Sequence, residues 1–128
     1  MKTIIAVIVV GLLAISVVDA GSSGDVSTAS AEKMVKDTKG LIILDVRTPE
    51  EYAAGHLANA KLMNYYDKNF TDQLKTLPKS KSVLIYCKSG RRSAETLALM
   101  KKLGYKKAYN MLGGFVAWSN EKRPSTTK

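Results

Sequence analysis

Short apolar runs alternate with helix-like segments along most of this chain. Residues 41–44 form a continuous apolar stretch, and residues 82–86 and 108–112 are mostly apolar; all three have the length of buried parallel strands. A weaker run at 58–63 indicates a further short strand. Because strands and helices alternate, the pattern predicts an α/β fold in which a small parallel β-sheet carries helices on both faces.

Between these runs, apolar residues recur at helical spacing. The positions that mark the helices are Ala31, Met34 and Val35; Phe70, Leu74 and Leu77; Ala94, Leu97, Ala98, Met100 and Leu103; and Phe115, Val116 and Trp118. A further short helix is predicted to begin at Pro49, with Thr48 as its N-cap, and to end at Gly55. Gly104 stands where a left-handed residue ends the long helix that follows residue 90.

The N-terminal residues follow a different pattern. Lys2 precedes an almost unbroken apolar run at 4–18. Val18 and Ala20 are small residues at the positions that a signal peptidase recognises. We therefore expect a signal peptide at 1–20 and a periplasmic or secreted protein. An uncleaved anchor is the weaker alternative, because a membrane-spanning helix needs about 20 apolar residues.

The rest of the chain divides simply. Gly-Ser chemistry predicts a flexible linker at 21–25, followed by one domain at 26–122 and a polar, disordered tail at 123–128. We expect no stable membrane insertion once the leader is removed, and a monomer.

The charge of the chain bears on which classes of partner it can bind. The 128 residues include 20 Lys and Arg against 11 Asp and Glu, which gives a formal net charge of +9. The lysines are scattered, without an arginine-rich tract or interleaved aromatic residues, so we expect a soluble basic surface rather than a nucleic-acid-binding one. No metal, nucleotide or Cys-x-x-Cys motif is present, and no cofactor is expected.

The only cysteine, Cys87, lies where a predicted strand gives way to a helix. The loop that it opens reads Cys-Lys-Ser-Gly-Arg-Arg-Ser over residues 87–93. Amides at a helix N-terminus carry partial positive charge, and Gly90 permits a turn whose N–H groups can surround an anion.

Full positive charges add to this environment. Lys88, Arg91 and Arg92 flank the thiol, so we expect its pKa to fall well below the ordinary value and Cys87 to be a reactive thiolate. An inert buried cysteine is the competing interpretation. An intermolecular disulfide is a further alternative for a lone cysteine in an exported protein.

Three stretches together resemble the rhodanese family, the thiosulfate sulfurtransferases, and in particular its exported, single-domain bacterial members. They are Leu-Asp-Val-Arg-Thr-Pro-Glu-Glu-Tyr at 44–52 with Gly-His-Leu at 55–57, Tyr-Cys-Lys-Ser-Gly-Arg-Arg-Ser-Ala at 86–94, and Leu-Gly-Gly-Phe-Val-Ala-Trp at 112–118. The resemblance implies a three-layer sandwich of the rhodanese type.

The resemblance also implies a mechanism. The Cys87 thiolate would take the outer sulfur of thiosulfate as a persulfide and pass it to a thiophilic acceptor, cyanide or a thiol. The residues implied in substrate binding are Lys88, Ser89, Gly90, Arg91 and Arg92. Arg92 is expected to hold the loop in place as much as to touch substrate.

Two other functions use similar chemistry. A cysteine phosphatase or arsenate reductase would place an arginine six positions after the cysteine, where this chain has Ser93; Arg92 comes one position earlier, and the shorter spacing favours sulfur transfer. A persulfide carrier that delivers sulfur to a protein partner would have the same loop, so it stays an alternative.

Polar residues at the other strand end are interpreted as structural. Asp45 and Arg47 are expected to form an ion pair rather than to line the pocket, and Glu51 is a candidate partner of Arg47. His56, the only histidine, is expected to make structural hydrogen bonds rather than to act as a general base.

Overall fold

A computed structural model describes residues 23–128; the predicted signal peptide and the first two linker residues lie outside the described residues. The elements in chain order are β1 (Gly24–Val26), α1 (Thr28–Asp37), β2 (Ile42–Asp45), α2 (Pro49–Ala54), β3 (Lys61–Leu62), α3 (Phe70–Lys75), β4 (Val83–Tyr86), α4 (Arg91–Lys102), β5 (Ala108–Met111) and α5 (Gly114–Asn120). All strand pairs are parallel, in the order β1-β5-β4-β2-β3.

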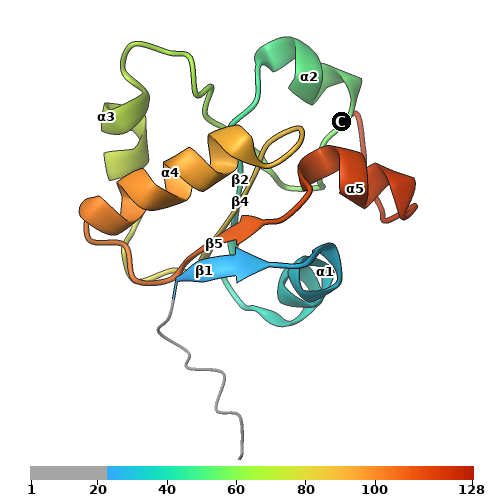
Figure 1. The fold of residues 1–128 in the computed structure, drawn as a ribbon, viewed down its shortest axis with the longest axis horizontal. Helices are drawn as coiled ribbons and strands as arrows, with labels where there is room; N and C mark the ends of the chain where they lie inside the picture. Colours follow the sequence, from blue (N-terminus) through green and yellow to red (C-terminus); the bar gives the residue numbers. More distant parts are fainter. Residues whose placement is uncertain (1–22) are drawn as a thin grey trace, which may run out of the picture.

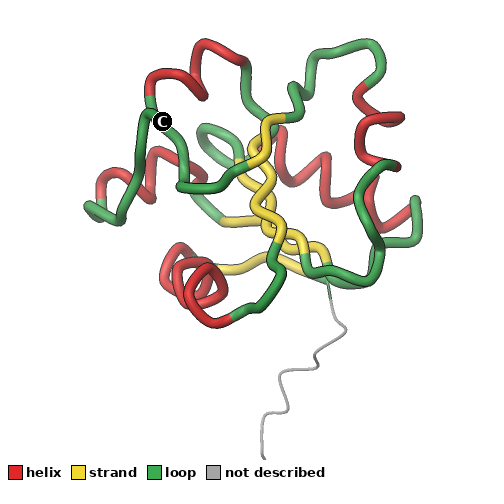
Figure 2. Tube along the Cα trace, turned by 180° about the vertical axis from the view of Figure 1, so that it is seen from behind, coloured by secondary structure: helices red, strands yellow, loops and turns green. Residues whose placement is uncertain are grey.

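The sheet lies between two layers of helices, as the sequence predicted (Figure 1, Figure 2). Alternate side chains of β4 pack against the two helix layers. Val83 and Ile85 pack with α3 and α4, and Leu84 and Tyr86 pack with α1, α2 and α5. Both faces of the strand are buried, which explains its continuous apolar sequence. The α/β three-layer architecture is confirmed.

Strand register brings the chemistry-bearing residues to one edge. Asp45 pairs with Tyr86 at the carboxyl ends of β2 and β4, so Cys87 emerges beside the segment that carries Arg47. Ligand sites of open parallel sheets lie at this edge.

Local signals for helix ends are confirmed. Thr48 and Glu51 form a reciprocal capping box at the start of α2, with Pro49 in the first turn. Gly55 caps the end of α2, and Gly104 follows α4 in the left-handed conformation.

Three expectations differ from the structure. Gly24 and Asp25, expected in the linker, belong to β1 and pair with Tyr109 and Asn110, because backbone hydrogen bonds form a strand there without an apolar pattern. The predicted strand at 58–63 is reduced to β3.

The third difference is the tail, expected to be disordered. Thr126 pairs with His56 as an isolated antiparallel bridge, with both N···O distances at 2.8 Å. The carbonyl oxygen of Pro124 accepts a hydrogen bond from the indole N–H of Trp118 at 2.9 Å. The hydrogen-bond partners of the tail are distant in sequence or are backbone groups, so the amino-acid composition of the tail does not predict these contacts.

Candidate active site

Cys87 lies between the end of β4 and the start of α4, with only 1% of its surface exposed. The loop curls back on the sulfur: the N–H of Gly90 donates to Sγ at 3.0 Å and the hydroxyl of Ser93 donates at 3.3 Å. Gly90 reaches this position with a φ of 116°, which a residue with a side chain rarely adopts. The backbone of the loop therefore forms a cradle of donors around one sulfur atom.

This cradle controls the ionisation of the thiol. Burial raises the pKa of Cys87, but hydrogen bonds from the Ser93 hydroxyl and from the N–H groups of Ser93, Gly90 and Ser89 outweigh it and hold the pKa below its ordinary value. The direction agrees with the sequence-based expectation, whereas the cause differs. Neutral hydrogen-bond donors, rather than the flanking cations, make the main contribution.

Helix α5 fixes the loop from the other side. The N–H of Phe115 donates to the carbonyl oxygen of Cys87 at 2.8 Å, and that of Val116 to the carbonyl oxygen of Lys88 at 3.0 Å. Such close approach requires Gly114, since a Cβ there would lie 2.5 Å from the oxygen of Lys88. The first turn of α5 thus orients the peptide groups that lead into the cradle.

The three cations of the loop have different surroundings. Arg92 is largely buried and forms two hydrogen bonds with the carboxylate of Glu51, at 2.9 and 3.0 Å. Arg91 is exposed and lies 3.5 Å from Glu95. Lys88 is exposed, and no carboxylate of residues 23–128 lies within ion-pair distance of its ammonium group. Arg92 ties α4 to α2, whereas Lys88 and Arg91 face solvent.

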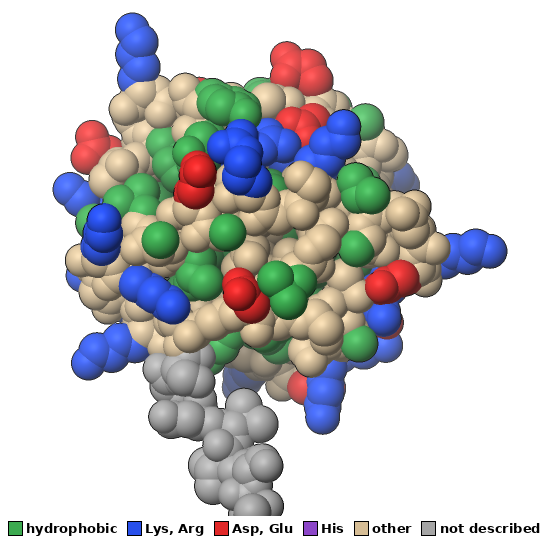
Figure 3. Space-filling model, in the orientation of Figure 1, with side chains coloured by type: hydrophobic (Ala, Val, Ile, Leu, Met, Phe, Trp, Pro, Cys, Tyr) green, Lys and Arg blue, Asp and Glu red, His purple; other side chains and the backbone are tan. Residues whose placement is uncertain are grey.

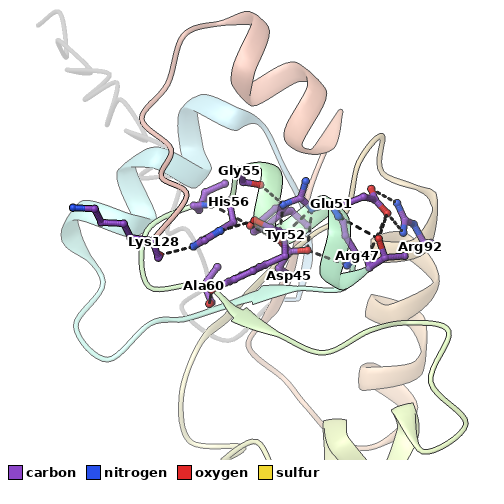
Figure 4. A network of polar contacts seen from close by, with 12 residues as sticks. Asp45, Arg47, Glu51, Tyr52, Gly55, His56, Ala60, Arg92 and Lys128 are labelled. Atoms are coloured by element: carbon purple, nitrogen blue, oxygen red, sulfur yellow. Dashed lines mark hydrogen bonds and ion pairs between the residues drawn. The ribbon is translucent and has the colours of Figure 1, made fainter.

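A buried polar network supports the neighbouring strand end (Figure 4). Arg47 pairs with Asp45 at 2.7 Å and donates to the carbonyl oxygen of Gly55 at 2.6 Å. The hydroxyl of Tyr86 donates to the same carboxylate at 2.6 Å, and burial, followed by the charge of Asp45, raises the pKa of this tyrosine.

The predicted ion pair of Asp45 and Arg47 is therefore confirmed. The suggestion that Glu51 pairs with Arg47 is wrong. The guanidinium of Arg47 is bound by Asp45, which lies only two residues away in the chain, and Glu51 pairs with Arg92.

His56 is structural, as expected. It is buried, stacks on Tyr52 with ring centroids 3.6 Å apart, and its ring nitrogens lie 2.8 Å from the carbonyl oxygens of Tyr52 and Lys128. Figure 4 shows the imidazole between these two partners. Both nitrogens are engaged away from Cys87, so this ring is not placed to act on the sulfur.

Sequence reasoning missed Ser93 as a site residue. Its hydroxyl is fully buried and contacts the sulfur directly. The signal was available, because a helix that begins at the end of such a loop turns its first residues back toward the cysteine.

Two hollows in the described surface lie away from the cysteine loop. One, of about 480 Å³, is lined by Ala54, Gly55, Phe115, Ser119 and residues 125–128; another, of about 540 Å³, lies along α1 and is lined by residues that include Val26, Met34 and Tyr109. Neither includes the cysteine loop, so chemistry rather than cavity size identifies the site.

Within residues 23–128, no group of three or more His, Cys, Asp or Glu side chains converges as a metal ion requires. The same part of the chain has no helix with the length and apolar character needed to cross a bilayer.

Comparison with protein families gives a match to the family described as Rhodanese-like domain, over residues 27–121. A sulfurtransferase of Allochromatium vinosum is 30% identical over 100 residues, which cover 78% of this chain and 92% of that protein. Thiosulfate sulfurtransferase GlpE of Coxiella burnetii is 32% identical, covering 73% of this chain and 84% of the relative.

A longer relative also matches. The probable adenylyltransferase/sulfurtransferase MoeZ of Mycobacterium tuberculosis is 32% identical over 89% of this chain, which spans only 29% of that protein.

Solved structures agree with the family match. A rhodanese-related protein from Thermoplasma volcanium superposes with a TM-score of 0.73 at 25% identity, covering 81% of this chain and 98% of the other. A rhodanese-like domain protein from Staphylococcus aureus gives 0.67 at 33% identity, covering 74% and 90%.

Proposed function

The chain belongs to the rhodanese-like domain family, and on that premise we propose that it is a sulfurtransferase that works through a persulfide on Cys87. Thiosulfate is the proposed donor, and cyanide or a thiol is the proposed acceptor. The observation that carries the proposal is the cradle of N–H and hydroxyl donors around a buried sulfur whose pKa is lowered. The sulfurtransferase names of the relatives support the same reaction class.

In the first step the Cys87 thiolate attacks the outer sulfur of thiosulfate. A bond forms between Sγ and that sulfur, the sulfur–sulfur bond of thiosulfate breaks, and its electron pair leaves with sulfite. The negative charge of the thiolate moves onto the new terminal sulfur. Lys88 and Arg91, both exposed at the loop, attract the doubly charged donor.

In the second step the acceptor attacks the terminal sulfur. Cyanide takes it as thiocyanate, the bond to Sγ breaks, and the electron pair returns to Sγ as a thiolate. The N–H of Gly90 and the hydroxyl of Ser93 already point at Sγ and stabilise this leaving thiolate without rearrangement. The loop N–H groups at Ser89 and Gly90 are the proposed donors to the persulfide.

Two contacts favour sulfur transfer over phosphate ester hydrolysis. The sixth position after the cysteine holds Ser93, whose hydroxyl is directed at the sulfur. The guanidinium of Arg92 is bound to Glu51 by two hydrogen bonds instead of standing free for a tetrahedral oxyanion.

The test is thiocyanate formation from thiosulfate and cyanide by the purified protein. We expect saturable turnover with ping-pong kinetics, and its loss in Cys87→Ser. Lys88→Ala is expected to raise the KM for thiosulfate several-fold, because one attracting charge is removed. Turnover that survives Cys87→Ser would contradict the proposal.

We also propose that the protein is exported, on the strength of Lys2 and the apolar run at 4–18. N-terminal sequencing of the protein made by the cell tests this. Mature protein that begins near Gly21 supports export, and an intact Met1 on cytoplasmic protein contradicts it.

A further inference from the structure

Exposed apolar side chains gather around the cysteine loop. Within residues 23–128 the exposed large hydrophobic side chains are Val35, Tyr66, Leu112 and Val116, at 37, 60, 50 and 43% exposure. Three of these four belong to segments that touch the loop, and only Val35, in the last turn of α1, does not.

The contacts that place them are specific. Val116 is in the turn of α5 whose N–H groups hold the carbonyl oxygens of Cys87 and Lys88. Leu112 immediately precedes Gly113, whose backbone nitrogen lies 3.7 Å from the position of a Cβ on Gly90.

Tyr66 contacts a different part of the loop. Its ring centroid is 5.7 Å from the guanidinium carbon of Arg92, at the other end of the loop. The exposed apolar residues therefore come from segments before β4 and after β5 that contact the same loop. We call the four residues Leu112, Val116, Tyr66 and Lys88 the loop rim.

Lys88 of the loop rim and the neighbouring Arg91 carry positive charge. Lys88 and Arg91 are both exposed, and only Arg91 has a carboxylate nearby, that of Glu95 at 3.5 Å. The net charge of the whole chain is +9. Figure 3 shows Lys and Arg side chains beside hydrophobic ones, with Asp or Glu side chains next to them, on the face where, in the same view in Figure 1, α4 begins.

A small anion such as thiosulfate or cyanide gains no binding energy from exposed leucine, valine and tyrosine side chains. A protein partner can bind such side chains, because protein–protein interfaces combine apolar contacts at their centre with charge complementarity at their edge. We propose that the loop rim docks an acidic protein that presents a thiol beside apolar side chains, and that this thiol is the acceptor of the Cys87 sulfur. This inference rests on the proposed function and names its acceptor.

The transfer balances as a thiol attack on the persulfide. The partner's sulfur forms a bond to the terminal sulfur, the bond to Sγ breaks, and its electron pair returns to Sγ as the thiolate. The proton of the partner's thiol moves to the terminal sulfur of the new partner persulfide. No oxidant or reductant is needed.

The test compares two synthetic peptides as acceptors, each with one cysteine between leucines. One carries glutamates at its flanks and the other lysines. Cys87 is loaded with inorganic polysulfide, so that a failure of thiosulfate as donor leaves the comparison intact. The rate of transfer to each peptide is divided by the rate to cyanide, which corrects for any change at the sulfur itself.

We expect the glutamate peptide to accept sulfur about tenfold faster than the lysine peptide. The double variant Leu112→Ser, Val116→Ser is expected to lower the ratio for the glutamate peptide about tenfold. Val35→Ser, which removes an exposed valine from the other edge of the sheet, is the matched control and should keep the wild-type ratio. Equal rates for the two peptides, transfer to cyanide alone, or the same ratio in the double variant as in wild type would each overturn the proposal.

Discussion

The sulfur of Cys87 is stabilised as an anion by groups that carry no net charge. Ser93 is the most informative of them, because its single hydroxyl proton has two acceptors: Sγ at 3.3 Å and the carbonyl oxygen of Gly90 at 3.2 Å. Ionisation of the thiol makes Sγ the stronger acceptor. The hydroxyl can thus respond to the charge on sulfur without any movement of the backbone.

Ser93→Ala should raise the pKa of Cys87 by removing this donor. Since the thiolate is the reacting form, the rate of persulfide formation rises with pH through the thiol pKa, and the variant's profile should move to higher pH. We expect about a tenfold loss near neutral pH, with recovery in alkali. The pH dependence of single-turnover sulfite release measures this.

Thr96→Val is the matched control for Ser93→Ala. It removes a buried hydroxyl of α4 that donates to the carbonyl oxygen of Arg92 and does not contact the sulfur. Its pH profile should match that of wild type. A profile for Ser93→Ala that coincides with wild type would remove Ser93 from the mechanism.

At the scale of elements, two helices hold the loop from opposite sides. α5 does so through its first N–H groups, and α2 through the ion pair of Glu51 with Arg92 at the start of α4. Neither contact involves the thiol directly. Both are therefore positions where a substitution can change the reaction by moving the loop.

Gly114→Ala tests the contact with α5. The added Cβ would meet the carbonyl oxygens of Cys87 and Lys88 at 2.7 and 2.5 Å and must push the loop and helix apart. We expect kcat to fall about tenfold or more and the pH profile to shift, because the donors to Sγ are displaced.

Gly104→Ala is a control for backbone strain alone. Its φ of +92° also lies in the left-handed region that alanine rarely adopts, but the nearest atom is the flexible ammonium group of Lys79 at 3.4 Å. This variant should lose stability and keep the wild-type pH profile. The same kinetics in both variants would contradict a positioning role for Gly114.

Glu51→Gln tests the contact with α2. The hydrogen bond from Arg92 lowers the pKa of Glu51 from 4.5 to about 2, so the pair stabilises the fold fully above pH 4.5 and loses this contribution as the pH falls toward 2. Solvent screens the pair, and we expect a loss of about 1 kcal/mol at neutral pH.

Urea unfolding at several pH values measures that loss, with Glu50→Gln as the control from the exposed side of the same helix. The difference between Glu51→Gln and wild type should shrink in acid. A difference that is the same at every pH would show that charge on Glu51 is not its source.

Much of this arrangement could be predicted from the sequence. Apolar runs located β2, β4 and β5, and Thr48, Gly55 and Gly104 marked helix ends, because these signals act over a few residues. The ion-pair partner of Glu51 could not be predicted from the sequence, since Arg47 and Arg92 carry the same charge and only their distances from Glu51 in the folded protein distinguish them. β1 was missed because its strand depends on β5, 85 residues away in the Asn110–Asp25 contact.

For the molecule as a whole, the last residues act as a strap across the layer of α2 and α5. Figure 1 places the C-terminal end beside α2. The strap is held by backbone groups of Pro124, Thr126 and Lys128, which contact Trp118 and His56. Two buried side chains thus depend on it for their hydrogen bonds.

Deletion of residues 124–128 should destabilise the protein, because it leaves the indole N–H of Trp118 and a ring nitrogen of His56 without partners. We expect Tm to fall by roughly 4–8 °C for each kcal/mol lost. The double variant Ser125→Ala, Thr127→Ala keeps the backbone contacts and should melt like wild type. A deletion that leaves Tm unchanged would restore the sequence-based picture of a disordered tail.

The most direct measurement of the central claim is the intact mass of the protein before and after thiosulfate, under non-reducing conditions. A persulfide on Cys87 predicts a gain of one sulfur, about 32 Da, that is removed by cyanide with release of thiocyanate and is absent from Cys87→Ser. A free thiol whose mass does not change with thiosulfate would contradict the account, as would a gain that persists in Cys87→Ser.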